Sequence, residues 1–262
     1  MHVTHHSVFR LTSLLLVVSS PAWASRAFPL SWDSQTMAPG THEFQSWVTA
    51  RYGRQDIGYT ELDLRLQAMQ AITDRVDTMF GFDVDLASFA LDSRSADARI
   101  SNTWRSSVLT STQAVGFAVV SRIALGLDNG ELEVRLVLDK QIGRLWLALN
   151  ASVMRAQFWS GRTGIDTRFE QSFGARYQVQ ESFAAGVEVR AREALQRSAY
   201  QGTAYSGGPT FSWVSVRWWV TFGLFVQAGA DKAHDDRGNG EPLEVRDNER
   251  FVGRLILGVK TD

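Results

Sequence analysis

The residues of this chain that could do chemistry are mainly arginines, aspartates and glutamates that alternate with apolar residues. An arginine guanidinium presents several fixed N–H donors and binds carboxylate and phosphate groups, whereas carboxylates attract cations. If both kinds faced one compartment, they would guide a small polar or anionic solute through it. The candidate lumen-lining and solute-binding residues on this polar face are Arg51, Arg65, Arg99, Arg105, Arg122, Arg135, Arg168, Arg176, Arg190, Arg192, Arg254, Glu61, Asp63, Asp83, Asp85, Glu133, Glu170 and Glu188.

The chain offers little for covalent catalysis. It has no cysteine, which excludes a disulfide scaffold, an iron–sulfur cluster, a thiolate nucleophile and a cysteine zinc site. Beyond residue 24 the histidines are His42, at the start of a predicted strand, and His234, in an acidic polar loop. Neither is placed beside a nucleophile as a general base must be, and an acidic loop is usually solvated. We therefore predict no enzyme activity, no catalytic residue, no cofactor and no metal.

Composition excludes further classes of protein. The chain of 262 residues carries 27 Lys and Arg against 28 Asp and Glu, so its formal charge is -1 and no bulk positive potential would attract a nucleic acid. Its hydrophobic fraction of 44% is too high for a disordered chain. Arginine outnumbers lysine by twenty-four to three, a bias that genomic base composition could also produce.

Residues 1–24 have the pattern of a secretory signal peptide. A short polar start precedes the apolar run Leu11–Ser20, and Pro21–Ala24 places small residues at a cleavage site. The apolar run is too short to span a bilayer comfortably as a helix. We expect an exported protein in which residues 25–40 are a short periplasmic segment and residues 41–262 form the folded domain.

Segment after segment of the mature chain alternates apolar and polar residues with a period of two, the pattern of β-strands. In Thr60–Ala68, leucines at 62, 64 and 66 point one way and the charged residues between them point the other. No stretch approaches the roughly eighteen apolar residues of a transmembrane helix. The predicted strands are roughly 42–54, 59–69, 76–87, 98–109, 115–126, 131–139, 144–156, 167–178, 183–194, 205–214, 218–230 and 250–261.

The connections between these strands alternate in length. Those after the second, fourth, sixth, eighth and tenth strands are short turns, whereas several on the other side are long and polar, the longest being Asp231–Glu249. Short turns at one end and long loops at the other are typical of bacterial outer-membrane barrels. We predict an all-β fold, a transmembrane antiparallel up-and-down β-barrel of twelve strands over residues 41–262. An even strand number puts both of its ends on the periplasmic side.

A soluble β-barrel or sandwich would show the same alternation with the apolar residues inside. Two features favour the inverted arrangement of a membrane barrel: the polar face is ionic along whole strands, and aromatic residues of the apolar face gather near strand ends, as at membrane interfaces. The expected location is the bacterial outer membrane, with its lipid and the barrel-assembly machinery as partners. The aromatic residues are Phe44, Phe183, Trp213 and Trp218 near the short turns and Tyr52, Phe169, Tyr205 and Phe251 near the long loops.

The charges of the polar face are sorted among the strands. Acidic residues dominate the first three predicted strands, and arginines dominate the fourth, fifth, eighth, ninth and twelfth. In a closed barrel, opposite charges would then face each other across the lumen. Two interpretations stay open: an arginine wall that guides an anionic or polar solute, or a narrow interior filled by arginine–carboxylate pairs.

The first predicted strands carry a further pattern. A proline–glycine turn precedes a strand with a glutamate and a Trp-Val-Thr run, and a basic–glycine turn, another strand and a Thr-Asp turn follow. With this pattern, residues 37–86 resemble the opening of an uncharacterised family of predicted bacterial outer-membrane β-barrel proteins and, less closely, the porin-like group associated with aromatic-degradation gene clusters. The resemblance implies location and fold, and no substrate. Its residues are Pro39-Gly40, Glu43, Trp47-Val48-Thr49, Arg54 and Thr73-Asp74.

One feature departs from the outer-membrane pattern. Many such barrels end on an aromatic residue after an alternating strand, whereas this chain ends in Lys260-Thr261-Asp262. The leading prediction is porin-like passive transport of a small polar or anionic solute through a lumen lined by Arg, Asp and Glu. The alternative is a non-conducting structural or partner-binding barrel that acts through its extracellular loops, especially Asp231–Glu249. The sequence leaves the solute and the oligomeric state open.

Overall fold

The computed structural model describes residues 27–53, 60–88, 94–111, 114–159, 164–196, 199–231 and 250–261. No helix within these ranges is long and apolar enough to cross a membrane. The strands in these ranges are β1 (His42–Tyr52), β2 (Thr60–Thr73), β3 (Val76–Ser88), β4 (Arg94–Leu109), β5 (Gly116–Gly126), β6 (Asn129–Ile142), β7 (Leu145–Phe158), β8 (Gly164–Gln178), β9 (Phe183–Gln196), β10 (Ala199–Val214), β11 (Trp218–Asp231) and β12 (Phe251–Thr261).

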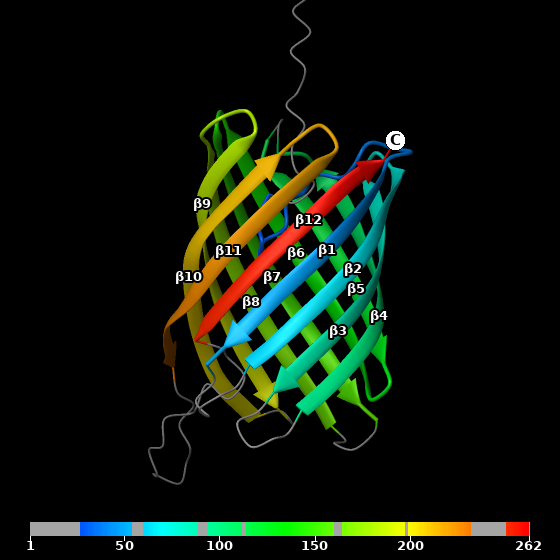
Figure 1. The fold of residues 1–262 in the computed structure, drawn as a ribbon, viewed down its shortest axis with the longest axis vertical. Coiled ribbons are helices and arrows are strands. Elements are labelled where there is room, and N and C mark those ends of the chain that lie inside the picture. Colours follow the sequence, from blue (N-terminus) through cyan, green and yellow to red (C-terminus); the bar gives the residue numbers. More distant parts are fainter. Residues whose placement is uncertain are drawn as a thin grey trace, which may run out of the picture.

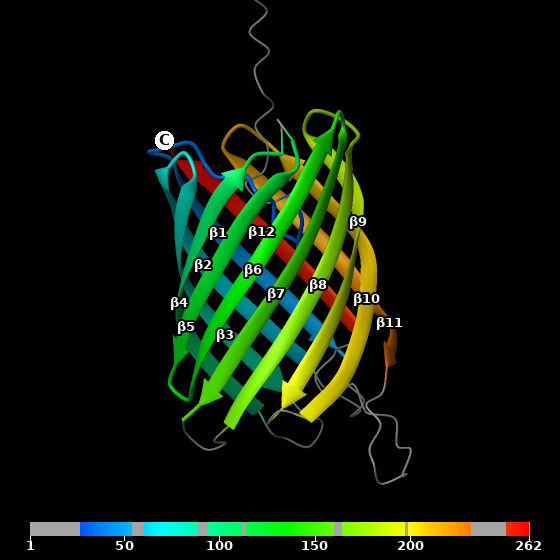
Figure 2. The same cartoon turned by 180° about the vertical axis from the view of Figure 1, so that it is seen from behind.

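These strands form one closed antiparallel barrel (Figures 1 and 2). Each strand pairs with its neighbours in sequence, and the barrel closes where β1 pairs with β12, from His42–Thr261 to Tyr52–Phe251. A closed sheet has no edge strand with unbonded N–H and C=O groups. The predicted all-β, up-and-down barrel of twelve strands is confirmed for the described part of the chain.

Each predicted strand is present, and several extend further toward the long-loop end than predicted. β4 begins at Arg94, β8 at Gly164 and β10 at Ala199. In β10 the turn-like segment Gly207–Pro209 lies inside the strand and pairs with β9. The reason is tertiary: a neighbouring strand that offers hydrogen-bonding partners outweighs the local preference of glycine and proline for turns.

The barrel is inverted relative to a soluble one. In β6, Leu132, Leu136 and Leu138 face outward with exposures of 51%, 48% and 42%, whereas Val137 and Asp139 face inward and are buried, at 0% and 2%. The same alternation runs around the barrel, so arginines and carboxylates fill the interior and the outer wall is apolar. Such an outer surface matches contact with lipid rather than with water.

Exposed aromatic residues lie near both ends of the barrel wall. Phe44 and Trp218 are 57% and 46% exposed on the side of the short turns, and Tyr52 and Phe251 are 58% and 51% exposed on the side of the long loops. Aromatic rings in two such positions correspond to the two interfaces of a membrane. The remaining predicted members are the exposed Trp213, Phe169 and Tyr205 and the half-buried Phe183.

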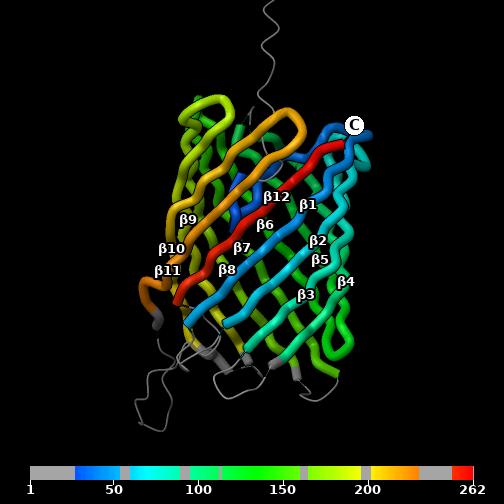
Figure 3. The backbone as a smooth tube through the Cα atoms, in the orientation of Figure 1, coloured from blue at the N-terminus to red at the C-terminus, as the bar shows by residue number. Residues whose placement is uncertain are grey.

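The chain enters the barrel before it forms the barrel wall. Residues 27–37 fold into the lumen through the short-turn end and then lead to β1 (Figure 3). We call these residues the plug; within it Phe28, Ser31 and Ser34 are 0% exposed. The expectation of a short periplasmic segment at residues 25–40 is therefore corrected for residues 27–37. The side chains that bind the plug come from strands far apart in the sequence, so no local sequence pattern predicts that residues 27–37 enter the lumen. The predicted signal peptide, residues 1–24, lies outside the described residues.

The outward position of Leu136 generates a prediction. Leu136→Arg should lower the free energy of unfolding in lipid vesicles by about 2–4 kcal/mol, because a charged side chain would face hydrocarbon near the middle of β6. Urea titration of the vesicle-inserted protein measures this change, with Leu136→Ala as the matched control. In a water-soluble barrel the arginine would be solvated, and a change within about 0.5 kcal/mol would contradict the membrane-facing assignment.

Candidate functional site

A cavity of about 540 Å³ occupies the lumen between the plug and the long-loop end. Its floor includes Leu30 and Trp32 of the plug. Its walls reach Ala87, Ser95 and Phe158, which lie close to the long-loop ends of their strands. The barrel therefore holds a charged cup whose base is made by the N-terminal part of the same chain.

The structure brings most of the predicted lumen residues together around this cavity. Three others, Arg105, Arg176 and Glu188, do not line it; they lie buried toward the short-turn end and contact the plug. Whether the lining residues bind a solute stays a prediction. The fifteen predicted residues that line the cavity are Arg51, Arg65, Arg99, Arg122, Arg135, Arg168, Arg190, Arg192, Arg254, Glu61, Asp63, Asp83, Asp85, Glu133 and Glu170.

Some lining residues were missed by sequence reasoning. Glu131 lies on the polar side of β6 and could have been identified from the same alternation that selected Glu133. Asp97 was assigned to a loop because β4 was predicted to begin after it. Leu30 and Trp32 carried no signal, because nothing local marks a segment that folds into a lumen.

The cavity has walls of opposite charge. We call the part formed by β8, β9 and β12 the basic wall and the part formed by β2 to β6 the acidic wall, and Arg51 of β1 lies between them. Among the described lining residues, the basic wall carries Arg168, Arg190, Arg192 and Arg254 against Glu170. The acidic wall carries Glu61, Asp63, Asp83, Asp85, Asp97, Glu131 and Glu133 against Arg65, Arg99, Arg122 and Arg135.

Ion pairs bridge the strands of the acidic wall. Arg122 binds Asp83 at 2.5 Å and Glu131 at 3.0 Å, and Arg99 pairs with Asp85 and Glu131. Buried carboxylates and guanidinium groups lose their hydration, so they require partners of this kind. The acidic wall is therefore a linked network in which arginines already neutralise much of the negative charge.

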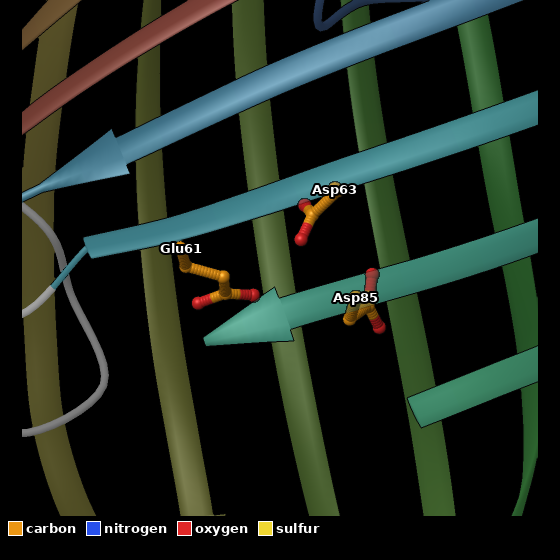
Figure 4. Close-up of side chains that lie close together, drawn as sticks. All are labelled: Glu61, Asp63 and Asp85. Carbon is orange, nitrogen blue, oxygen red and sulfur yellow. The ribbon is translucent and has the colours of Figure 1, made fainter. Parts of the chain in front are cut away.

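Three carboxylates of the acidic wall have oxygens close enough together to share a cation. Glu61 and Asp63 extend from β2 and Asp85 from β3 into the lumen (Figure 4), with oxygens within 4.8 Å of one another. Arg51 forms ion pairs with both Glu61 and Asp63, and Arg99 forms one with Asp85. Because these guanidinium groups already supply the opposite charge, the cluster is part of the ion-pair network.

Among the described lining residues, the basic wall has more arginines than carboxylates. Glu170 accepts contacts from three guanidinium groups, those of Arg135 at 3.4 Å, Arg190 at 3.7 Å and Arg192 at 3.2 Å. Arg135 comes from the acidic wall and also pairs with Glu133 at 2.8 Å, so on the basic wall itself Glu170 pairs with Arg190 and Arg192. An anionic group entering the cavity therefore meets an excess of guanidinium donors on this side.

Arg254 has neutral partners. Its Nε donates to Thr49 Oγ1 at 3.0 Å, its Nη1 donates to the carbonyl oxygen of Pro29 at 3.1 Å, and its guanidinium lies 5.7 Å from the ring centre of Trp47. Within the described part of the chain, no carboxylate forms an ion pair with Arg254. Its charge is therefore available to an anion in the cavity that it lines.

The plug is bound through its backbone by side chains of the wall. Glu188 accepts hydrogen bonds from the backbone N–H groups of Leu30 at 3.1 Å and Ser31 at 2.7 Å. Asn150 accepts from the N–H of Trp32 at 2.7 Å and donates to its C=O at 3.0 Å, as a neighbouring strand would. These side chains satisfy backbone groups that would otherwise be buried without partners.

An ion pair between Asp33 and Arg105 holds the part of the plug that follows Trp32. Asp33 pairs with Arg105 at 3.5 Å, and Arg105 also donates to Asp77 at 2.9 Å. Burial raises the pKa of the Asp33 carboxyl to about 6, because the charged form loses its hydration, and Arg105 opposes this shift. At neutral pH the carboxylate is therefore still largely ionised and can pair with Arg105.

The arrangement can bind ions and polar groups. His42 is exposed at the start of β1 and does not line the cavity, and His234 lies outside the described residues. The lining residues offer guanidinium donors, carboxylate acceptors and two tryptophan faces, Trp32 and Trp47. Recognition of a charged or polar solute is the chemistry that this set supports most directly.

Comparisons with known proteins bear on the fold. No family model matches the chain, and no curated protein matches it. Among solved structures, the COG4313 outer membrane channel from Pseudomonas putida F1 is similar, with a TM-score of 0.64, 11% sequence identity and coverage of 87% of this chain and 98% of that chain. The β domain of the Bordetella autotransporter BrkA has a TM-score of 0.57 at 7% identity, with 85% and 100% of the two chains covered.

A porin also belongs to this group of similar structures. The KdgM porin in complex with disordered oligogalacturonate has a TM-score of 0.51 and 9% identity, and the likeness covers 85% of this chain and 99% of that chain. Identities this low establish a likeness of fold. The chain thus has the barrel fold seen in bacterial outer-membrane channels, porins and autotransporter domains.

Proposed function

We propose that the protein is an outer-membrane channel for passive uptake of a small polar or anionic solute. The observation that carries this proposal is the cavity of about 540 Å³ between an acidic and a basic wall. The solute enters from the long-loop end, and its anionic group binds at the basic wall, where Arg190 and Arg192 share Glu170. The hydroxyl groups of the solute bind the carboxylates and arginines of the acidic wall.

The field inside the cavity favours an anion that also carries polar groups. Opposed charged walls with a low-dielectric surround orient a solute and raise its local concentration. A uniformly basic lumen would attract any anion, whereas here the acidic wall repels highly charged anions and accepts hydroxyl donors. A monosaccharide acid has the matching chemistry, with one carboxylate and several hydroxyl groups.

Structural likeness supports the channel proposal. The similar structures include a channel and porins of the outer membrane, and the KdgM porin is described with oligogalacturonate, a chain of sugar acids. For this chain we infer export by a cleaved signal peptide over residues 1–24, insertion by the barrel-assembly machinery, and long loops on the extracellular side. The apolar outer wall and the two aromatic bands support insertion in lipid.

A second candidate function rests on a specific observation. The plug occupies the lumen at the short-turn end, and ion pairs span much of the remaining interior. A barrel filled in this way fits a non-conducting structural protein whose extracellular loops bind a partner. Such a barrel would pass no solute in any state, and deletion of residues 232–249 would remove its phenotype without impairing folding.

Uptake into liposomes separates the two functions. Liposomes that contain the refolded full-length protein should take up glucuronate faster than glucose, because the two sugars differ by one carboxylate and the basic wall binds that group. Swelling rates measure the uptake, and protein-free liposomes give the background. If neither the full chain nor a chain lacking the plug passes either sugar, passive transport is contradicted and the non-conducting barrel is favoured.

Charge selectivity should depend on the basic wall. Arg190→Gln combined with Arg192→Gln should lower the anion-to-cation permeability ratio several-fold, because two positive charges leave the cavity lining. The reversal potential in a salt gradient across a planar bilayer measures this ratio. Arg217→Gln, an exposed turn position at the short-turn end, is the matched control and should leave the ratio unchanged. An equal ratio in the double variant and the wild type would contradict the role given to this wall.

A further inference from the structure

The plug and the cavity share two arginines, Arg254 of the basic wall and Arg135 of the acidic wall. We propose that an anionic group bound at the basic wall draws Arg254 away from the plug and thereby opens the channel. The plug would then be a gate that responds to the solute. This inference rests on the transport function proposed above, and the experiment below separates the failure of one from the failure of the other.

The wall is shaped to receive the plug. An added Cβ at Gly174 would come within 2.8 Å of the Phe28 ring, and one at Gly223 would come within 2.9 Å of Pro29 Cγ. Both contacts are closer than ordinary van der Waals distances, so Gly174 leaves room for Phe28, and Gly223 leaves room for Pro29 and for the Phe225 ring, which would lie closer still. The plug is therefore seated in a fitted site.

The plug can leave this site without opening the barrel. Its backbone bonds go to wall side chains such as Glu188 and Asn150, whereas the ladder that closes the barrel joins β1 directly to β12. Its described apolar contacts fall in four small clusters, in which Phe28 meets Trp146, Leu30 meets Phe225, Met37 meets Met69 and Trp32 packs beside Val120. Release of the plug thus breaks side-chain contacts and leaves every strand pair intact.

Arg135 and Arg254 connect the plug to the cavity. Arg254 Nη1 donates to the C=O of Pro29 at 3.1 Å, and Arg135 Nη1 donates to the C=O of Leu30 at 3.2 Å. Both arginines also line the cavity. The two carbonyl groups belong to the part of the plug that meets the cavity floor, where Leu30 is itself a lining residue. A ligand in the cavity therefore reaches the same guanidinium groups that hold the plug.

A carboxylate is the stronger partner for Arg254, whereas Arg135 already pairs with Glu133 at 2.8 Å and with Glu170 at 3.4 Å. A hydrogen bond between two charged groups is roughly twice as strong as one between neutral groups, and an arginine fork can bind both oxygens of a carboxylate. Arg254 now has a hydroxyl, a carbonyl and a tryptophan face as partners. The guanidinium groups of Arg51, Arg65 and Arg190 also act on it electrostatically, with Asp63 as a counter-charge. An arriving anion relieves this repulsion as well as binding Arg254.

Opening by the solute requires a difference in affinity between two states. A ligand shifts an equilibrium only as far as it prefers one state, so a tenfold rise in the open-to-closed ratio needs about tenfold tighter binding to the open state. With the plug in place, Arg254 has part of its fork occupied by the carbonyl of Pro29. With the plug released, the fork of Arg254 faces the solute, which supplies the preference.

A reversible lock on the full-length protein tests the gate. Ser31 Oγ of the plug donates to Ser172 Oγ of β8 at 3.0 Å, and the chain has no cysteine of its own. The variant Ser31→Cys with Ser172→Cys can therefore form a disulfide that ties the plug to the wall. We expect the oxidised protein in planar bilayers to stay closed in glucuronate, and reduction of the same sample to restore opening. Each single cysteine variant is the matched control and should be insensitive to oxidation.

The ligand response is measured in the reduced variant and the wild type. Glucuronate on the long-loop side should raise the open-to-closed ratio about tenfold, and glucose should leave it unchanged. Arg254→Gln should raise opening without ligand and weaken the response to glucuronate, because it removes one plug contact and one anion contact. Gly229→Ala adds a methyl group where nothing lies within 4 Å and should behave as the wild type.

The outcomes distinguish the gate from the channel. If the oxidised double-cysteine protein conducts glucuronate as well as the reduced one does, or if glucose opens the wild type as well as glucuronate does, the gate is overturned while transport stands. If the reduced protein and a chain lacking the plug both stay closed, with β-sheet circular dichroism intact, transport itself fails and the gate fails with it.

Discussion

Closure of the sheet between β1 and β12 is the constraint on which the rest of the molecule depends. A lipid environment offers no hydrogen-bonding partner, so every backbone N–H and C=O of a spanning strand must be bonded within the sheet. Once the sheet is closed, strand periodicity allows two destinations for side chains, lipid or lumen. The leucines of β6 face outward, and Glu131, Glu133 and Arg135 face inward, for this single reason.

Charged side chains confined in a lumen lose their hydration and are stabilised by partners of opposite charge. The two walls differ in how their arginines are paired. In the acidic wall, Arg99 and Arg122 each bind more than one carboxylate and join neighbouring strands. In the basic wall, one carboxylate, Glu170, pairs with Arg190 and Arg192, and Arg254 is held by neutral groups. The interpretation of a packed interior thus fits the acidic wall, and the proposed solute-guiding role rests on the basic wall.

The plug joins these features into one system. A segment without regular structure can be buried only if its backbone groups are bonded, and wall side chains such as Glu188 and Asn150 bind them. Space for its side chains comes from wall glycines such as Gly174. The same inward-facing residues that a solute would meet also hold this segment, so occupancy of the cavity and position of the plug are physically linked through Arg135 and Arg254.

The sequence alone determined the strands, their number, the inverted pattern and most of the cavity lining, because a period of two directly encodes which face each residue takes. Arg190 and Glu170, for example, were placed on the polar face from alternation and line the cavity. Tertiary structure alone decided the extended start of β10, the pairing of individual charges, and the burial of residues 27–37. Those features depend on contacts between residues far apart in the chain: Glu188 meets Leu30 across 158 positions, and no local pattern can encode such a contact.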